Sequence, residues 1–150
     1  MKDYAKTAHE NFKKGYNCAQ AVFIAFADEM GLDEVTAAKL SSSFGGGMGK
    51  MREVCGAVSG ALMVLGMMKG NYDPADDKAK AAHYAKVQEF AAQFKAEHET
   101  IICRELLKNL ALKKEHTSEP EKRTEEYYKV RPCVRFVETA AKTVAEMIAE

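Results

Sequence analysis

The chain carries no excess charge of either sign, since its 22 lysines and arginines balance 22 aspartates and glutamates. A nucleic-acid-binding surface needs a basic excess gathered on one face, so we expect no nucleic-acid partner. The longest apolar run, residues 54–68, is shorter than the ~20 residues that a membrane-spanning helix needs. Residues 1–16 are polar and charged, unlike a signal peptide. These absences predict a cytoplasmic protein that does not associate with membranes.

The sequence also lacks closely spaced cysteines. Its four cysteines, Cys18, Cys55, Cys103 and Cys133, contain no CxxC pair, which excludes a zinc ribbon and a thioredoxin motif. In a cytoplasmic protein, such residues are better interpreted as reduced thiols, metal ligands or redox groups than as a disulfide framework. No Walker loop, Rossmann fingerprint or Ser/His/Asp arrangement stands in a suitable context. The cysteines are therefore the residues best suited to carry chemistry.

No segment alternates in the manner of a strand, whereas apolar residues recur at helical spacing throughout. We expect residues 1–150 to form one all-α domain, a compact multi-helix bundle with a substantial core. The expected helices are 3–14, 18–30, 34–44, 55–69, 74–98, 101–114, 119–128 and 133–150. Several starts are predicted from capping signals, namely Asn17, Asp33, Asp73 before Pro74, Thr100 and Ser118.

We expect the rest of the chain to be organised around residues 44–70. Consecutive glycines let this backbone turn sharply and direct several N–H groups toward one object. The helix that follows is apolar on every side, which predicts a central core element. Two glycines near its start allow a backbone or a bulky group to come close. The glycines assigned to cofactor binding are Gly45, Gly46, Gly47, Gly49, Gly56 and Gly60.

Each cysteine begins, or nearly begins, an expected helix and heads its apolar stripe, so all four thiols are expected to point inward. If successive helices run up and down, the cysteine helices all begin at one end of the bundle, and the sulfurs converge. The positive end of a helix dipole favours thiolate and is expected to lower the thiol pKa. Arginines beside the cysteines are expected to offset the charge of a thiolate-bound metal: Arg52, Arg104, Arg131 and Arg135.

Four short motifs and one helix carry a family resemblance: GYNCAQAV, FGGGMG, VCGAVSGALMVLG, ICRELL and the helix that begins at Cys133. At these residues the sequence resembles the C_GCAxxG_C_C family of bacterial and archaeal proteins described as redox-active. The family pattern corresponds here to Cys18, residues 55–60, Cys103 and Cys133, and the resemblance covers nearly the whole chain. Similar domains occur joined to multihaem cytochromes, so the resemblance implies an electron-transfer role or an iron–sulfur centre.

Several functions remain open. We favour one site in which Cys18, Cys55, Cys103 and Cys133 bind an iron–sulfur cluster, [2Fe–2S] in preference to [4Fe–4S], for electron transfer or redox sensing. The alternatives are metal-free thiol/disulfide chemistry, structural zinc, and a non-catalytic helical module with inert buried cysteines. An electron-transfer protein is the expected partner, and a homodimer is the commonest oligomeric state. The sequence does not decide whether the chain is an enzyme.

Overall fold

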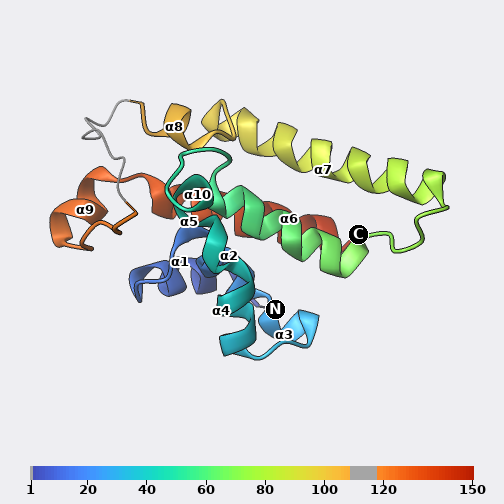
Figure 1. Cartoon of the computed structure of the whole chain (residues 1–150), viewed down its shortest axis with the longest axis horizontal. Helices are drawn as coiled ribbons and strands as arrows, with labels where there is room; N and C mark the ends of the chain where they lie inside the picture. Colours follow the sequence, from blue (N-terminus) through green and yellow to red (C-terminus); the bar gives the residue numbers. More distant parts are fainter. Residues whose placement is uncertain (1, 109–117) are drawn as a thin grey trace.

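The computed structural model describes residues 2–108 and 118–150, and these residues are mostly helical. The elements are α1 (Tyr4–Lys13), α2 (Cys18–Ala25), α3 (Ala27–Met30), α4 (Glu34–Ser41), the 3₁₀-helix η1 (Ser42–Phe44), α5 (Gly45–Met48), α6 (Gly56–Lys69), α7 (Asp77–His98), α8 (Cys103–Leu106), α9 (Glu125–Val130) and α10 (Cys133–Ile148) (Figure 1). Within the described ranges, the only β pairing is an isolated antiparallel bridge between Val54 and Ile102. The predicted all-α fold class is confirmed.

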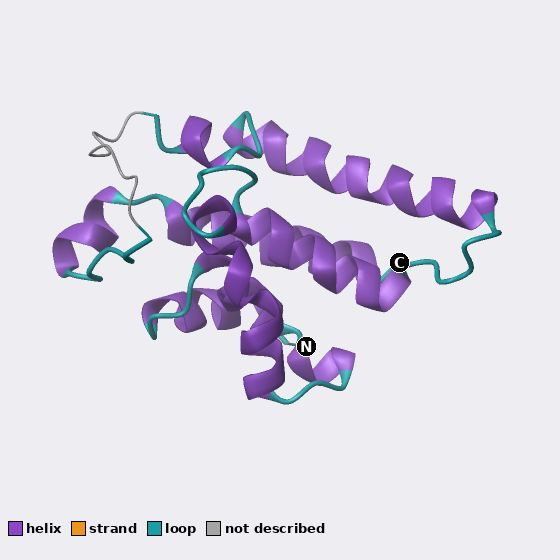
Figure 2. Ribbon diagram, viewed as in Figure 1, coloured by secondary structure: helices purple, strands orange, loops and turns teal. Residues whose placement is uncertain are grey.

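The helices α6 and α10 pack against each other in the middle of the molecule (Figures 1 and 2). On one side α2 packs against α6 and α1 packs against α10, while α7 lies along both from the opposite side. A helix with neighbours in several directions needs apolar residues around most of its circumference, as α6 has. In the described part of the chain, no helix has both the length and the apolar character needed to cross a membrane.

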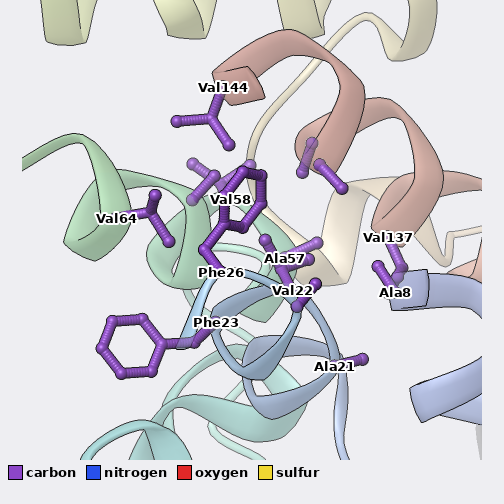
Figure 3. Close-up of a cluster of buried hydrophobic side chains, with 14 of the residues drawn as sticks. Ala8, Ala21, Val22, Phe23, Phe26, Ala57, Val58, Val64, Val137 and Val144 are labelled. Carbon is purple, nitrogen blue, oxygen red and sulfur yellow. The ribbon is translucent and has the colours of Figure 1, made fainter. Parts of the chain in front are cut away.

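The core lies between these central helices (Figure 3). Phe26, between α2 and α3, is fully buried among residues that include Val58 of α6 and Val144 of α10, and Tyr4 stacks on its ring with 4.2 Å between centroids. The backbones of α2 and α6 come very close at Gly60. A Cβ at this position would lie only 2.6 Å from the carbonyl oxygen of Ala19. This close packing holds the beginnings of α2 and α6 together.

Two predicted helices are interrupted. Residues 18–30 form α2 and α3 with a break at Phe26, whose backbone is non-helical at φ −107° and ψ 10°. No glycine or proline marks this break, and the buried Phe26 side chain turns inward at the point where the chain changes direction. Residues 34–44 leave the α conformation after Ser41 and continue as η1. The short helices α3 and α5 also interrupt the simple up-and-down order expected from the sequence.

The long helix α7 begins later than predicted and ends where predicted. Its N-cap is Asp76, whose side chain accepts the N–H of Ala79. Asp73 instead accepts the N–H of Ala75 and forms a turn, so it does not cap the helix. The helix ends at His98, and Glu99 follows with φ 74°, which confirms the predicted break before Thr100.

Two later boundaries were predicted wrongly. The N-cap of α8 is Ile102 and not Thr100, and residues 109–114 of the predicted helix 101–114 lie outside the described residues. The helix α9 begins after Thr124, whose side chain accepts the N–H of Tyr127, whereas a start after Ser118 was expected. The glutamate expected in the capping box, Glu121, forms an ion pair with Arg131 instead.

Candidate functional site

Every cysteine lies at the beginning of a helix. Cys18, Cys103 and Cys133 are the first residues of α2, α8 and α10, and Cys55 is the N-cap of α6. The start of α2 is held by a capping box, in which the Asn17 side chain accepts the N–H of Gln20 and the Gln20 side chain accepts the N–H of Asn17. The starts of α6, α8 and α10, in contrast, have no side-chain cap hydrogen bond among the described residues.

The four cysteines line one cavity of about 70 Å³. All four are free, so none takes part in a disulfide; Cys55 and Cys103 are buried, and Cys18 and Cys133 are half-buried. The wall also includes Arg52, Arg123, Tyr127, Arg131 and Phe136. Side chains that are far apart in the sequence are thus gathered around one small space.

A backbone pairing brings Cys55 and Cys103 together. The N–H of Cys55 donates to the carbonyl of Ile101 at 2.8 Å, and the N–H of Cys103 donates to the carbonyl of Glu53 at 2.6 Å. These bonds flank the isolated bridge between Val54 and Ile102. Two segments about fifty residues apart in sequence are therefore joined beside the cavity, a contact for which the sequence carries no recognisable signal.

The glycine after Cys55 makes room for Cys18. A Cβ at Gly56 would lie 2.5 Å from Cys18 Sγ and 2.8 Å from the carbonyl oxygen of Phe44. Such distances are shorter than van der Waals contact, so a larger residue would push α2 and α6 apart. Gly56 therefore acts here by allowing the close approach of a sulfur.

Residues 43–53, which contain the consecutive glycines and are called the glycine loop below, include several residues in the left-handed backbone conformation. Gly46, Gly47 and Gly49 have positive φ, as do Met48, Lys50 and Arg52. The N–H groups of Gly49, Lys50, Arg52 and Glu53 donate to carbonyls of residues 43–47, so these donors are engaged within the loop and do not point at a ligand. A Cβ at Gly47 would lie 2.8 Å from Cys103 Cβ, which shows that the loop is pressed against the start of α8.

The six glycines assigned to cofactor binding occupy different places. Gly46 and Gly56 line the cysteine cavity, while Gly45 and Gly49, together with Gly46, line a groove next to it. Gly47 packs on Cys103, and Gly60 packs on the backbone of α2. Direct exposure to the cavity is thus limited to Gly46 and Gly56.

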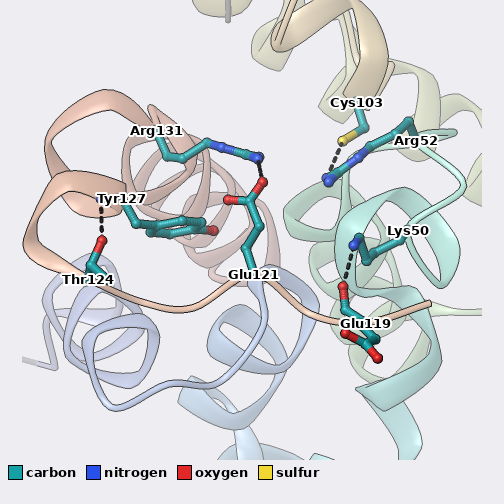
Figure 4. A network of polar contacts seen from close by, with 8 residues as sticks. All are labelled: Lys50, Arg52, Cys103, Glu119, Glu121, Thr124, Tyr127 and Arg131. Atoms are coloured by element: carbon teal, nitrogen blue, oxygen red, sulfur yellow. Dashed lines mark hydrogen bonds and ion pairs between the residues drawn. The ribbon is translucent and has the colours of Figure 1, made fainter. Parts of the chain in front are cut away.

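Three guanidinium groups surround the cavity (Figure 4 draws two of them). Arg52 Nη1 lies 3.9 Å from Cys103 Sγ, and the buried Arg131 forms an ion pair with Glu121. Arg123 is the third, and it was not predicted. Its position was not signalled, because it lies in a polar segment ten residues before Cys133.

Two of the four arginines expected at the site lie elsewhere. Arg104 is exposed and forms an ion pair with Glu53, and Arg135 is also exposed; neither lines the cavity. Neighbouring positions on a helix point in different directions, so closeness in sequence to a cysteine does not ensure closeness to its sulfur. Tyr127 was missed as well, although it lines the cavity between Arg123 and Arg131.

Burial controls the protonation of three of the cysteines. It raises the pKa of Cys55 well above the usual value, raises the pKa of Cys103, and raises the pKa of Cys133 to about 12. Repulsion from Cys18 contributes to each increase, which shows that Cys18 is close to the other three. For Cys55, Cys103 and Cys133 the predicted lowering of the thiol pKa is wrong, because the loss of hydration outweighs the helix ends and the arginines.

Opposing contributions are nevertheless present. Backbone N–H groups of Val58 and Ala57 favour the Cys55 thiolate and lower its pKa, and Arg52 does the same for Cys103.

The sulfurs do not surround one point at bonding distance. The described residues, which include all four cysteines, contain no group of three or more His, Cys, Asp or Glu side chains placed to hold a metal ion.

Comparison with known proteins identifies the family. The family model described as "Putative redox-active protein (C_GCAxxG_C_C)" matches residues 16–147, a range that includes all four cysteines and the glycine loop. Searches among curated proteins and among solved structures found no match. The four cysteines that the family name spells out are the residues gathered around the cavity. The chain therefore belongs to the C_GCAxxG_C_C family.

Proposed function

We propose that Cys18, Cys55, Cys103 and Cys133 form one redox site that holds an iron–sulfur cluster of the [2Fe–2S] type, and that the protein transfers electrons or senses redox state. The observation that carries the proposal is the meeting of four cysteines, from the starts of four helices, around one cavity. Four thiolates are a complete ligand set for the common clusters. When bound, such a cluster accepts and donates single electrons.

The volume and the lining of the cavity support the proposal. Its volume of about 70 Å³ is several times the roughly 10–15 Å³ that one water molecule requires. Gly46 and Gly56 add no side chains beside the sulfurs, and Leu106, Leu107 and Phe136 supply apolar walls. An apolar surround limits solvent access, which is one means by which proteins tune the potential of a metal centre.

The spacing of the cysteines in the sequence favours an iron–sulfur cluster over structural zinc. Structural zinc sites with four thiolates usually take their ligands from closely spaced pairs, and the four cysteines here contain no CxxC pair. A [2Fe–2S] cluster also takes four thiolates.

The protonation of the thiols also bears on the choice between a metal-bound site and metal-free thiol/disulfide chemistry. Because the pKa values of Cys55, Cys103 and Cys133 are raised, these thiols are protonated at neutral pH and a metal must displace their protons. Arg52 and Arg131 then stand beside an anionic site and offset its charge. Thiol/disulfide exchange without metal needs a thiolate nucleophile, and the raised pKa values make Cys55, Cys103 and Cys133 poor nucleophiles for that alternative.

The first prediction concerns metal content. Protein purified without oxygen is expected to be brown and to contain iron and acid-labile sulfide, and both Cys55→Ser and Cys133→Ser are expected to abolish the bound iron. Iron and sulfide analysis with electron paramagnetic resonance of the reduced protein measures this. Val134→Ala, beside Cys133 on α10 but outside the cavity, is the matched control and should retain iron.

Three other outcomes would contradict the proposal. Colourless protein that contains zinc would identify a structural site. Metal-free protein with a thiol pair that titrates reversibly would identify dithiol chemistry. Iron lost in only one of the two serine variants would show that Cys55 and Cys133 do not share a site.

A further inference from the structure

A groove of about 320 Å³ adjoins the cysteine cavity. It lies between the glycine loop and residues 118–123, where Lys50 donates to the carbonyl of Glu119 (Figure 4). The groove and the cavity share six lining residues: Asn17, Gly46, Arg52, Arg123, Tyr127 and Arg131. Anything bound in the groove is therefore next to the wall that surrounds the sulfurs.

The described lining of the groove is strongly basic. Lys50, Arg52, Arg123 and Arg131 face it, against one carboxylate, Glu121. The whole chain has no net charge, so this concentration of positive charge is a local feature. A concave surface of one sign focuses its field and attracts small ions of the opposite sign.

Arg123 is held rigidly by neutral groups. Its guanidinium donates to the carbonyls of Phe12 and Tyr16 at 3.1 and 3.0 Å, and it lies over the Phe12 ring, 4.2 Å from the centroid. It also lies near the aromatic rings of Tyr127 and Tyr128 and donates to the Tyr128 hydroxyl. Among the described residues no carboxylate pairs with it, so its charge is fixed in position but not neutralised.

We propose that this groove is a binding site for a small oxyanion, recognised through Arg123 with Lys50, Arg52 and Arg131. Guanidinium groups present planar sets of N–H donors that match anionic oxygens, and a prearranged guanidinium loses little freedom on binding. The groove volume is at the lower end of the range for small-molecule sites, which fits an inorganic oxyanion or the phosphate of a small metabolite. This site is additional to the proposed redox function, and the two sites share Arg52 and Arg131.

The experiment measures anion affinity by isothermal titration calorimetry on the full chain as purified, at low ionic strength. The probes are sodium sulfate and adenosine 5′-monophosphate. Saturable binding of sulfate in a 1:1 ratio is the expected result. Tighter binding of adenosine 5′-monophosphate would identify the phosphate of a larger molecule as the source, and equal or weaker binding would identify a free oxyanion. Absence of saturable binding by both probes would overturn the proposal, whatever the iron content.

Two variants test the residues. Arg123→Gln and Lys50→Asn are each expected to weaken sulfate binding roughly tenfold or more, because each removes a charged donor. Asparagine tolerates the left-handed backbone of Lys50, so Lys50→Asn provides a readout even if Arg123→Gln does not fold. Arg135→Gln removes an exposed guanidinium near Cys133 but outside the groove, and should leave the affinity unchanged. An equal loss in Arg135→Gln would indicate general electrostatic attraction and would overturn the site.

Discussion

The thiol of Cys133 lies in the first turn of α10, where the helix dipole favours its ionised form, yet burial raises its pKa to about 12. Repulsion from Cys18 adds to the increase, and the charge of Arg131 opposes it. The free energy of hydrating a thiolate is large and is lost inside the cavity, while the helix end offers only a partial charge. The single residue is therefore governed by its surroundings more than by its place in the helix.

The raised pKa predicts how the stability of the metal-free, reduced protein depends on pH. In the unfolded chain this thiol ionises near pH 9, whereas in the folded protein it stays protonated to about pH 12. Between these values the unfolded state binds fewer protons, so the free energy of unfolding falls as pH rises above about 9. Urea denaturation at pH 7.5, 9 and 10 should show a shallower decline for Cys133→Ser than for the unmodified chain, by at most about 1.4 kcal/mol per pH unit. Parallel declines would show that the buried thiol is not responsible.

Gly56 provides a second prediction for a single residue. Gly56→Ala should destabilise the protein by about 1–3 kcal/mol, because the added Cβ would meet Cys18 Sγ and the carbonyl of Phe44. Chemical denaturation measures the change. Gly66→Ala on the same helix is the matched control: nothing lies within 4 Å of its Cβ position, so alanine there should stabilise the helix by roughly 0.5–1 kcal/mol. Similar effects at the two positions would contradict the close approach of Cys18.

Helix bounds were predicted well where neighbouring residues define them and poorly where contacts between distant segments define them. α1 and α10 appear within one or two residues of their predicted bounds, because apolar residues at helical spacing define them. α9 begins later than predicted because Glu121 pairs with Arg131 and does not complete a capping box. The pairing of Cys55 and Cys103 with distant backbone carbonyls was not predictable, since it involves two short segments without strand patterning.

The turn between α7 and α8 supplies a prediction for an element boundary. Glu99 adopts φ 74°, a backbone region that glycine enters without steric cost. Glu99→Gly should therefore raise the free energy of unfolding by about 0.5–1 kcal/mol, as measured by urea denaturation. Ala96→Gly, three residues earlier within α7, should lower it by about 1 kcal/mol because glycine disfavours helix. Destabilisation by both changes would show that the Glu99 conformation is not strained.

For the whole molecule, the four cysteines connect the starts of α2, α6, α8 and α10 around one cavity. A metal group bound by all four would link elements from both halves of the sequence, and it would bind the folded state alone. Removing it with a chelator should lower the melting temperature by roughly 10 °C, since tight binding contributes about 4 kcal/mol at a thousandfold excess over Kd. Cys133→Ser provides the control, because its melting temperature should not respond to the chelator. No response in the unmodified chain would contradict a group shared by the four helices.

The sequence by itself determined the helical class, the positions of the cysteines at helix starts and the family, because helical periodicity, capping and motifs are properties of neighbouring residues. Only the tertiary structure decided which distant residues surround the sulfurs, including Arg123 and Tyr127. It also decided that the pKa values of Cys55, Cys103 and Cys133 are raised. Burial and close approach arise from contacts between segments far apart in the chain, and no local pattern encodes them.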